Sequence, residues 1–122
     1  MANILIVEDE AATAWALEEG LTDEGHAITT VDSAEKALTA LKAQKPDVVI
    51  TDVRLPRMDG VELVRRMNKG KHAAPVIVVT AYGSRDVLQQ LSDYGVHATF
   101  AKPFRLEQLV RSVKSALDRK AS

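Results

Sequence analysis

The sequence predicts an α/β fold in which helices cover both faces of a five-stranded parallel sheet. Short apolar runs rich in β-branched residues recur along the chain, and segments with helical spacing separate them. A regular alternation of strand and helix is typical of a parallel sheet with right-handed crossovers. Three of the runs also lack the apolar–polar alternation of a half-exposed strand, which indicates burial on both faces.

The predicted strands define the sheet. The runs without alternation are the first, the third and the fourth, so these three are expected to be the best covered. The five predicted strands are Ile4–Val7, Ala27–Val31, Val48–Thr51, Val76–Val79 and Ala98–Ala101.

Each gap after a strand carries apolar residues at helical spacing. Ser33 and Ser84 are expected N-caps, and Gly25 and Gly95 are expected to end the helices before them. Gly20 costs the first helix, about 11–24, roughly 1 kcal/mol relative to alanine, so this helix has the weakest pattern. The apolar stripes of the five helices are Ala14, Leu17, Leu21; Ala34, Ala37, Leu38, Leu41; Val61, Val64, Met67; Val87, Leu88, Leu91; and Leu106, Leu109, Val110, Val113, Leu117.

Length and composition limit the function classes. A chain of 122 residues has the size of one domain, and we expect that domain to span 1–119, with a frayed tail at 120–122. A net charge of −1 gives no basic footprint for nucleic acid. The chain has no cysteine, which excludes disulfides and thiol chemistry and is compatible with the cytoplasm, the expected location. The first apolar run is too short for a signal peptide or a membrane span.

Acidic residues follow two of the predicted strands. Glu8, Asp9 and Glu10 come directly after the first strand, and Asp52 comes directly after the third. Ligands of open parallel sheets bind beyond the carboxyl ends of the strands, so we expect these carboxylates to share a pocket. An all-oxygen set without a histidine pair or a thiol favours Mg²⁺, with Mn²⁺ as the alternative, over zinc.

Two further polar residues follow the remaining strands of this edge, Thr80 after the fourth and Lys102 after the fifth. A metal between Asp9 and Asp52 would neutralise their repulsion and leave Asp52 as a nucleophile that forms an acyl phosphate. Lys102 would meet the phosphoryl oxygens as a positive charge, and Thr80 would donate a hydrogen bond to them. Acids after strands are also common as helix caps and solvated loop residues, and Thr80 or Lys102 taken alone is weak evidence. Thr80 and Lys102 become strong evidence for a site because they are expected at the same edge of the sheet as Asp9 and Asp52.

Together these residues resemble the receiver domain of two-component response regulators, over essentially the whole chain. The resemblance implies a flavodoxin-like, doubly wound sheet of order 2-1-3-4-5. It implies that Asp52 accepts a phosphoryl group from a histidine kinase or a histidine phosphotransfer protein, and that the domain is a switch and not a turnover enzyme. The matching segments are VEDE at 7–10, TDVRLPRMDG at 51–60, VVTA at 78–81 and AKPF at 101–104.

The resemblance also assigns roles around the acceptor. It implies magnesium held by Asp9, Asp52 and the backbone carbonyl of Arg54, with Glu8 acting through water. It implies a cis peptide bond between Lys102 and the proline that follows. Phosphorylation is expected to change the binding of a downstream protein or output domain through the face of the fourth helix, fifth strand and fifth helix. The domain itself is expected to touch neither nucleic acid nor a membrane.

The chain departs from the family pattern at one place and is distinctive at two others. Receivers usually carry Tyr or Phe three residues before the lysine, where the ring turns inward as the threonine moves toward phosphate. Thr99 holds that place here, and Phe100 is expected to pack in the core. The coupling is then weaker, or another side chain carries it. Arg54 and Tyr82 lie two residues after the acceptor and the threonine, where bulky side chains are expected to shield the phosphoryl group and prolong its lifetime.

Several alternatives remain open. A hydrolase with an aspartate nucleophile would normally carry a second aspartate where Arg54 stands. A flavin or nucleotide module would need a Gly-rich loop after the first strand, where this chain has three acids. A receiver used only as a scaffold is disfavoured because all four site positions are filled. The chain is either a free-standing receiver or the N-terminal receiver of a larger regulator with a DNA-binding or enzymatic output domain.

Overall fold

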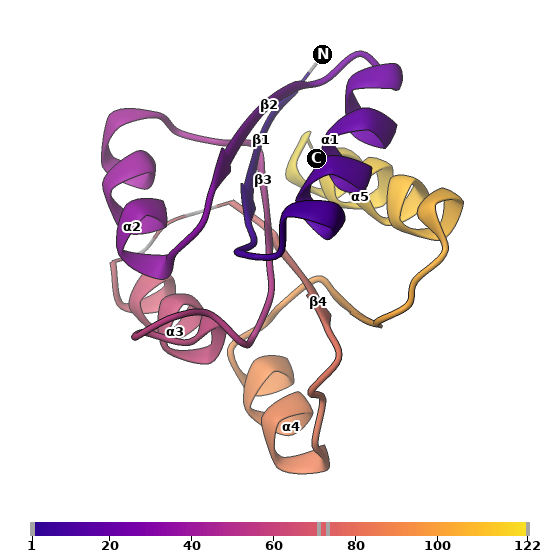
Figure 1. Ribbon diagram of the computed structural model, residues 1–122. Coiled ribbons are helices and arrows are strands. Elements are labelled where there is room, and N and C mark those ends of the chain that lie inside the picture. The colour runs from indigo at the N-terminus through magenta and orange to yellow at the C-terminus, as the bar shows by residue number, and fades with distance from the viewer. Residues whose placement is uncertain (1, 71, 73, 122) are drawn as a thin grey trace.

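The computed structural model describes residues 2–70, 72 and 74–121, and in them the expected alternation of five strands and five helices is present (Figure 1). The predicted elements are all found, with ends that differ from the predicted ones by a few residues at most. In chain order the elements are β1 Asn3–Val7, α1 Ala11–Asp23, β2 Ala27–Val31, α2 Ala34–Ala43, β3 Val48–Thr51, α3 Gly60–Lys69, β4 Val76–Thr80, α4 Arg85–Asp93, β5 Ala98–Ala101 and α5 Leu106–Ala121.

The strands form one parallel sheet in the order β2-β1-β3-β4-β5, which confirms the expected topology. The three strands without polar alternation are the inner ones. β3 and β4 are buried along their whole length, and β1 is buried except at Asn3. The edge strands β2 and β5 are only partly covered. Coverage of both faces therefore explains the unbroken apolar runs.

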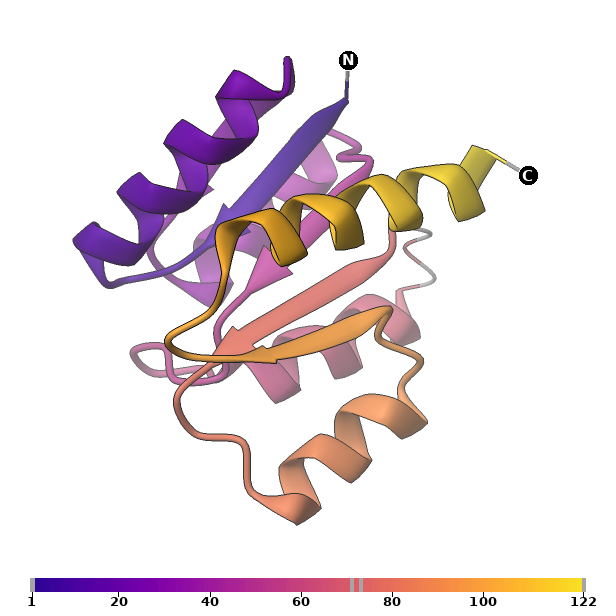
Figure 2. The ribbon, with the colours of Figure 1, turned by 90° about the vertical axis from the view of Figure 1, so that its right-hand side faces the viewer.

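Alternate residues of the inner strands supply two separate cores, because successive side chains of a strand point to opposite faces. Leu5 and Val7 of β1 pack with apolar residues of α2, α3 and α4. Ile4 and Ile6 pack on the other face with apolar residues of α1 and α5. Each fully buried side chain of this kind contributes about 1.5–3 kcal/mol. Figures 1 and 2 show the resulting arrangement, with α1 and α5 on one side of the sheet and α2, α3 and α4 on the other.

Local signals fix several helix ends. The side chains of Ser33, Asp59 and Ser84 each accept a hydrogen bond from the backbone N–H three residues later and cap α2, α3 and α4. Gly25 and Gly95 follow α1 and α4 with φ of 88° and 79°, a left-handed conformation that glycine adopts without a steric penalty. Four of these five ends were predicted from the sequence.

Gly20, the weak point of the first predicted helix, has a packing role. A Cβ built on Gly20 would lie 2.6 Å from the Leu106 side chain of α5. The absent side chain thus allows Leu106 to lie directly on α1. Contact with α5 offsets the low helix propensity of glycine at this position.

At the C-terminus, the backbone of α5 remains helical through Ala121. Two of the three residues expected in a frayed tail are therefore helical, while Ser122 lies outside the described residues, and the boundary at 119 stays a prediction. Within the part of the chain that the structure describes, no helix has both the length and the apolar character needed to cross a membrane.

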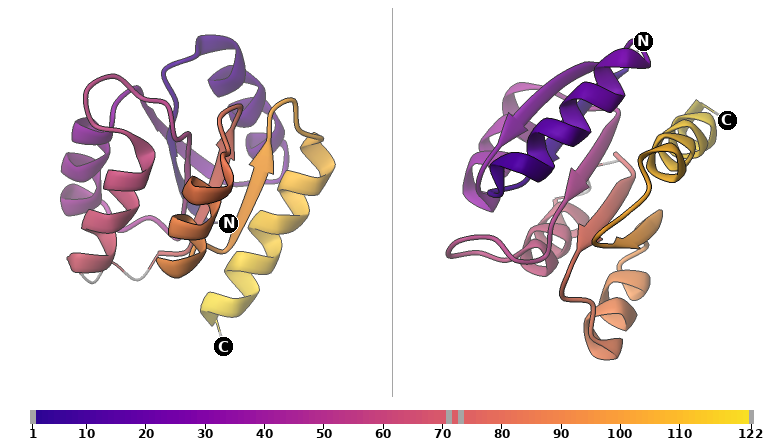
Figure 3. Two further views of the ribbon diagram at one scale, coloured as in Figure 1. Left: turned by 90° about the horizontal axis from the view of Figure 1, so that it is seen from below. Right: turned by 45° about the vertical axis from the view of Figure 1, so that its right-hand side comes forward.

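The parallel arrangement sends the carboxyl ends of all strands to one edge of the sheet. Figure 2 shows the segments that leave β1, β3, β4 and β5 gathered at this edge. Figure 3 shows α4 beside the β4–β5 end of the sheet, far from α1. The residues directly after the strands are therefore the ones that can form a shared site.

Candidate functional site

The register of the sheet brings the four candidate positions together. Val7 pairs with Thr51 at the ends of β1 and β3, and the Asp52 N–H donates to the Val7 carbonyl at 3.1 Å. On the other side Thr80 pairs with Ala101 at the ends of β4 and β5. Backbone pairing alone thus places Glu8, Asp52, Thr80 and Lys102 along one sheet edge.

Lys102 reaches across this edge to two buried carboxylates. Its Nζ lies 2.7 Å from Asp52 Oδ2 and 2.7 Å from Glu8 Oε1. The end of β4 lies between the two residues, so their backbones are about two strand spacings apart, roughly 9–10 Å, and the Lys102 and Asp52 side chains together bridge this gap. A long side chain is needed for that reach. The structure therefore confirms that an amine from the fifth strand meets the acid of the third.

Electrostatics in this cluster follow from burial and pairing. Burial alone would lower the pKa of Lys102, but its hydrogen bonds to Asp52 and Glu8 outweigh burial and raise that pKa well above its usual range. Burial raises the pKa of Glu8, against the opposing hydrogen bond from Lys102. The ammonium stays charged at neutral pH and holds two buried carboxylates that would otherwise repel each other.

Asp52 is oriented from both sides. It is 6% exposed, and its Oδ1 accepts a hydrogen bond of 3.2 Å from the Arg54 N–H while its Oδ2 accepts from Lys102. Behind it, the loop returns so closely that a Cβ on Gly60 would lie 2.0 Å from the Asp52 carbonyl oxygen. Glycine at position 60 is therefore required for the observed backbone path beside the carboxylate.

Thr80 and its neighbours complete the rim of the site. The buried Thr80 hydroxyl accepts a 3.0 Å hydrogen bond from the Tyr82 N–H. The Tyr82 ring carries the Arg54 guanidinium over its face, with Cζ 4.2 Å from the ring centroid, a cation–π contact. The sequence marked Arg54 and Tyr82 as a bulky pair, but it gave no signal that they touch.

The expected metal ligands are brought together only in part. Glu8 and Asp52 converge on one cation, the Lys102 ammonium, whereas Asp9 is exposed and forms no hydrogen bond or ion pair through its side chain with any described residue. No cluster of three or more His, Cys, Asp or Glu suited to a metal ion occurs among residues 2–70, 72 and 74–121. Mg²⁺ is usually held by one or two carboxylates, with water and phosphate oxygens completing its shell, so two converging carboxylates fit it. Asp9 as a ligand stays a prediction.

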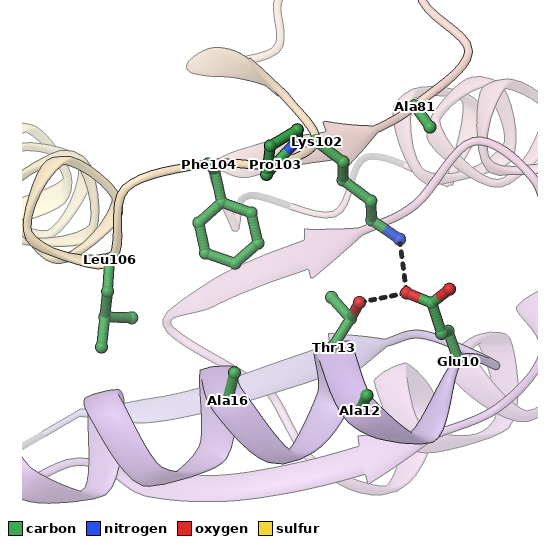
Figure 4. A pocket seen from close by; sticks show the side chains of 9 residues that line it. All are labelled: Glu10, Ala12, Thr13, Ala16, Ala81, Lys102, Pro103, Phe104 and Leu106. Atoms are coloured by element: carbon green, nitrogen blue, oxygen red, sulfur yellow. Dashed lines mark hydrogen bonds and ion pairs between the residues drawn. The ribbon is translucent and has the colours of Figure 1, made fainter.

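Glu10 is a site residue whose role the sequence analysis did not foresee. Its carboxylate accepts from the Thr13 hydroxyl and lies 3.7 Å from Lys102 Nζ (Figure 4). Glu10 is the N-cap residue of α1, but its side chain makes no capping hydrogen bond there. Its place directly after Glu8 and Asp9 was the available signal, and helix capping was the competing explanation.

A pocket of about 540 Å³ opens beside Lys102, between the start of α1 and the segment that follows β5 (Figure 4). Ala12 and Ala16 leave room on the helix side, and Phe104 and Leu106 form the opposite wall. The peptide bond between Lys102 and Pro103 is cis, as the resemblance implied. The lining residues are Glu10, Ala12, Thr13, Ala16, Ala81, Lys102, Pro103, Phe104 and Leu106.

On β5, the two residues before the site behave as the sequence suggested. Position 99 carries a threonine in place of an aromatic ring, and this Thr99 is exposed. Phe100 is half-buried and packs against the core that α1 and α5 cover. An aromatic ring lies near Asp52 from another segment, because the Tyr82 ring contacts the side chain of Arg54, whose N–H donates to the Asp52 carboxylate.

Comparison with known proteins agrees with this geometry. The sequence profile of the response regulator receiver domain matches residues 4–114. The chain therefore belongs to the response regulator receiver domain family, whose members are signalling switches. The site residues and the motifs around them were the features from which that membership was predicted.

Individual relatives differ in length. The chain is 34% identical over 120 residues to sporulation initiation phosphotransferase F of Bacillus subtilis, covering 98% of this chain and 97% of that protein. It is 35% identical to the transcriptional regulatory protein PdtaR of Mycobacterium tuberculosis over 96% of this chain, which spans only 57% of the length of PdtaR. A CheY-like receiver domain protein from Methanospirillum hungatei superimposes with a TM-score of 0.94 at 26% identity, over 99% of this chain and 97% of the other.

Proposed function

We propose that Asp52 is the phosphoryl acceptor of this receiver domain. The observation that carries the proposal is the position of its carboxylate, buried at the end of β3 between the Lys102 ammonium and the Arg54 N–H. The donor is a histidine kinase or a histidine phosphotransfer protein. The pocket beside Lys102 gives apolar side chains of such a protein a place to dock close to the acceptor.

In the transfer, an Asp52 oxygen attacks phosphorus, and the bond from phosphorus to the donor's imidazole nitrogen breaks with its electron pair returning to that nitrogen. Lys102 stabilises the charge on the phosphoryl oxygens. The Thr80 hydroxyl already accepts from the Tyr82 N–H, so its own hydrogen is the one it can donate to the phosphoryl group.

Magnesium, or manganese, would be held by Asp9, Asp52 and the Arg54 backbone carbonyl, with Glu8 acting through water, and would neutralise negative charge on the phosphoryl oxygens. This assignment accounts for an exposed Asp9 whose carboxylate has no partner among the described residues, beside two buried acids that share one ammonium.

Phosphorylated Asp52 then changes the binding of a downstream protein or a covalently attached output domain, through the face formed by α4, β5 and α5. Coupling of this kind is typically worth about 1–3 kcal/mol, enough to alter partner affinity without refolding. The domain acts in the cytoplasm as a switch and not as a turnover enzyme, and it contacts neither nucleic acid nor a membrane itself.

Incubation with Mg²⁺ and acetyl phosphate, followed by intact-mass measurement, tests the proposal. We expect a labile adduct of one phosphate that EDTA blocks and Asp52→Asn abolishes. Asp23→Asn, which alters an exposed acid at the far end of α1, is the matched control and should be phosphorylated like the parent. An adduct that persists in Asp52→Asn would refute the assignment, and rapid turnover of a phosphomonoester would favour a hydrolase.

A further inference from the structure

The loop that follows β3, which begins with Asp52, and the loop that follows β4 are joined by a continuous set of contacts. The Arg54 N–H donates to Asp52 Oδ1 at 3.2 Å, and the Arg54 guanidinium lies 4.2 Å above the Tyr82 ring. The Tyr82 N–H in turn donates to Thr80 Oγ1 at 3.0 Å. Arg54 and Tyr82 therefore connect the proposed acceptor to the proposed phosphoryl-binding hydroxyl along the outer rim of the site.

The contact between the two side chains is the weakest part of this connection. Tyr82 is 55% exposed, and cation–π contacts are weak where water competes for the cation. A guanidinium binds a phosphoryl group far more strongly, because charge-assisted hydrogen bonds form in a planar, bidentate arrangement. Since the Arg54 backbone already touches the Asp52 carboxylate, a phosphoryl group on Asp52 would lie within reach of the Arg54 side chain.

Phosphorylation would also act on the other end of the connection. Once Thr80 donates to the phosphoryl group, its hydroxyl is drawn toward Asp52 and away from the Tyr82 N–H. Tyr82 lies two residues before Ser84, the N-cap of α4, so a change at Tyr82 falls directly on the segment that positions this helix. On β5, the exposed Thr99 has no ring to perform a comparable movement.

We propose that Arg54 and Tyr82 form a latch. The guanidinium stacks on Tyr82 while Asp52 is free, and it turns onto the phosphoryl group when Asp52 is modified. Tyr82 is then released and passes the state of Asp52 on to the start of α4. Tyr82 is a positioning residue in this scheme, because it touches the site only through Arg54 and Thr80. The inference rests on Asp52 being the acceptor.

Tyrosine ring resonances report the latch directly. The chain has two tyrosines, and in protein labelled with ring-¹³C tyrosine the second one, Tyr94 at the C-cap of α4, gives a separate signal at the opposite end of that helix. Signals are recorded for the protein alone, with Mg²⁺, and with Mg²⁺ and acetyl phosphate. Intact mass is measured on the same samples. We expect the Tyr82 ring signals to shift on phosphorylation, beyond any change caused by Mg²⁺ alone, because the ring loses the cation above it.

Variants of Arg54 test whether its side chain changes partner on phosphorylation or only lies beside Tyr82. In Arg54→Ala the Tyr82 signals should lie near their released position before phosphate is added and should lose most of their response to phosphorylation. Arg54→Lys, which keeps a cation, should retain part of that response. Arg57→Ala is the matched control, since this exposed arginine of the same loop pairs with Glu35 and should behave like the parent. Backbone amide spectra confirm that each variant is folded.

The possible failures are distinguishable. If the adduct forms and the Tyr82 signals do not move, or if they move equally in Arg54→Ala, the latch is refuted while the acceptor assignment stands. If no adduct forms in the parent protein, the acceptor assignment and the latch are both refuted.

Discussion

Lys102 is the residue on which the charge balance of the site depends. One ammonium faces the two buried carboxylates of Glu8 and Asp52, with Glu10 a little further away. Breaking a buried pair leaves an uncompensated charge and costs several kcal/mol, about 3–5 in typical cases. Even with Lys102 in place, the cluster has more negative than positive charge, so it can take up a further cation or a group whose oxygens Lys102 can reach.

The lifetime of the phosphoryl group is the property we expect Arg54 and Tyr82 to control. Both side chains lie at the rim of the site and restrict the approach of water to phosphorus. Removing both in an Arg54→Ala, Tyr82→Ala variant should speed loss of the adduct by about tenfold, equivalent to roughly 1.4 kcal/mol in the barrier. The decay is followed by intact mass after acetyl phosphate is removed. An unchanged decay rate would eliminate shielding by this pair.

At the level of single residues, the sequence predicted where the site lies better than it predicted which site residues contact one another. Asp52, Thr80 and Lys102 could be located because each directly follows a predicted strand, although β4 itself extends to include Thr80. The sequence analysis chose Asp9 as the acid that shares a cation with Asp52, although successive residues leave a strand on opposite sides and Glu8 is equally acidic. The structure buries Glu8 against Lys102 and leaves Asp9 exposed.

Helix α3 begins where the loop after the acceptor turns back on itself, and Gly60 makes that turn possible. Gly60→Ala would place a Cβ about 2 Å from the Asp52 carbonyl oxygen, so the backbone must shift. We expect a loss of about 1–3 kcal/mol in the free energy of unfolding, measured by urea denaturation, together with slower phosphorylation. Gly83→Ala is the control, because its nearest neighbour is the flexible end of Leu88 at 3.3 Å. Equal stability of both variants would show that the loop adapts.

Charge pairs on α3 predict how its stability depends on pH. The Glu62 carboxylate accepts hydrogen bonds from Arg65 and Arg66, which lower its pKa from 4.5 to about 2. A carboxyl whose pKa is lower in the folded state stabilises the protein above pH 4.5, and this contribution is lost as the pH falls toward about 2. Glu62→Gln should therefore be less stable than the parent at pH 7, with a difference that shrinks across this window.

Urea denaturation at several pH values measures that difference. Glu19→Gln, which changes an exposed glutamate of α1, provides the comparison and should differ little from the parent throughout. A difference for Glu62→Gln that stays constant between pH 7 and the lower end of the window would contradict the assignment of the stabilisation to the charged carboxylate.

Among the elements, predictability followed the strength of the local signal. Apolar periodicity located all ten elements, and caps such as Ser33 fixed their ends. Gly20 weakened the prediction of α1 because its benefit, close contact with Leu106, comes from a helix far away in the sequence. The cation–π contact of Arg54 and Tyr82 has the same origin. It joins two loops whose proximity follows only from the sheet order.

For the whole molecule, the alternation of elements predicted a parallel sheet, but the strand order came from the family resemblance. Many orders bury the same apolar runs, and single residues carry little information about which strand lies beside which. The order β2-β1-β3-β4-β5 matters for function because it sets β1 beside β3, so that the two acidic segments become neighbours.

A divalent cation at this junction should stabilise the entire domain. Its ligands would come from the segments after β1 and β3, which separate when the sheet unfolds, so binding is linked to folding. With free Mg²⁺ at ten times its dissociation constant, the free energy of unfolding should rise by about 1.4 kcal/mol. Thermal or urea unfolding with and without MgCl₂, at constant ionic strength, measures the increase.

The variants decide which acids hold the ion. The Asp9→Asn variant should lose most of the Mg²⁺-dependent increase in the free energy of unfolding. The Asp23→Asn variant, which changes an exposed acid at the end of α1 and outside the site, should keep it. An equal increase in Asp9→Asn would remove Asp9 from the ligand set and leave Glu8 and Asp52, the two carboxylates that already converge on Lys102, as the binding pair. No increase in the parent protein would mean that Lys102 alone supplies the positive charge in the resting state. Magnesium would then bind together with the phosphodonor, whose oxygens would complete its coordination.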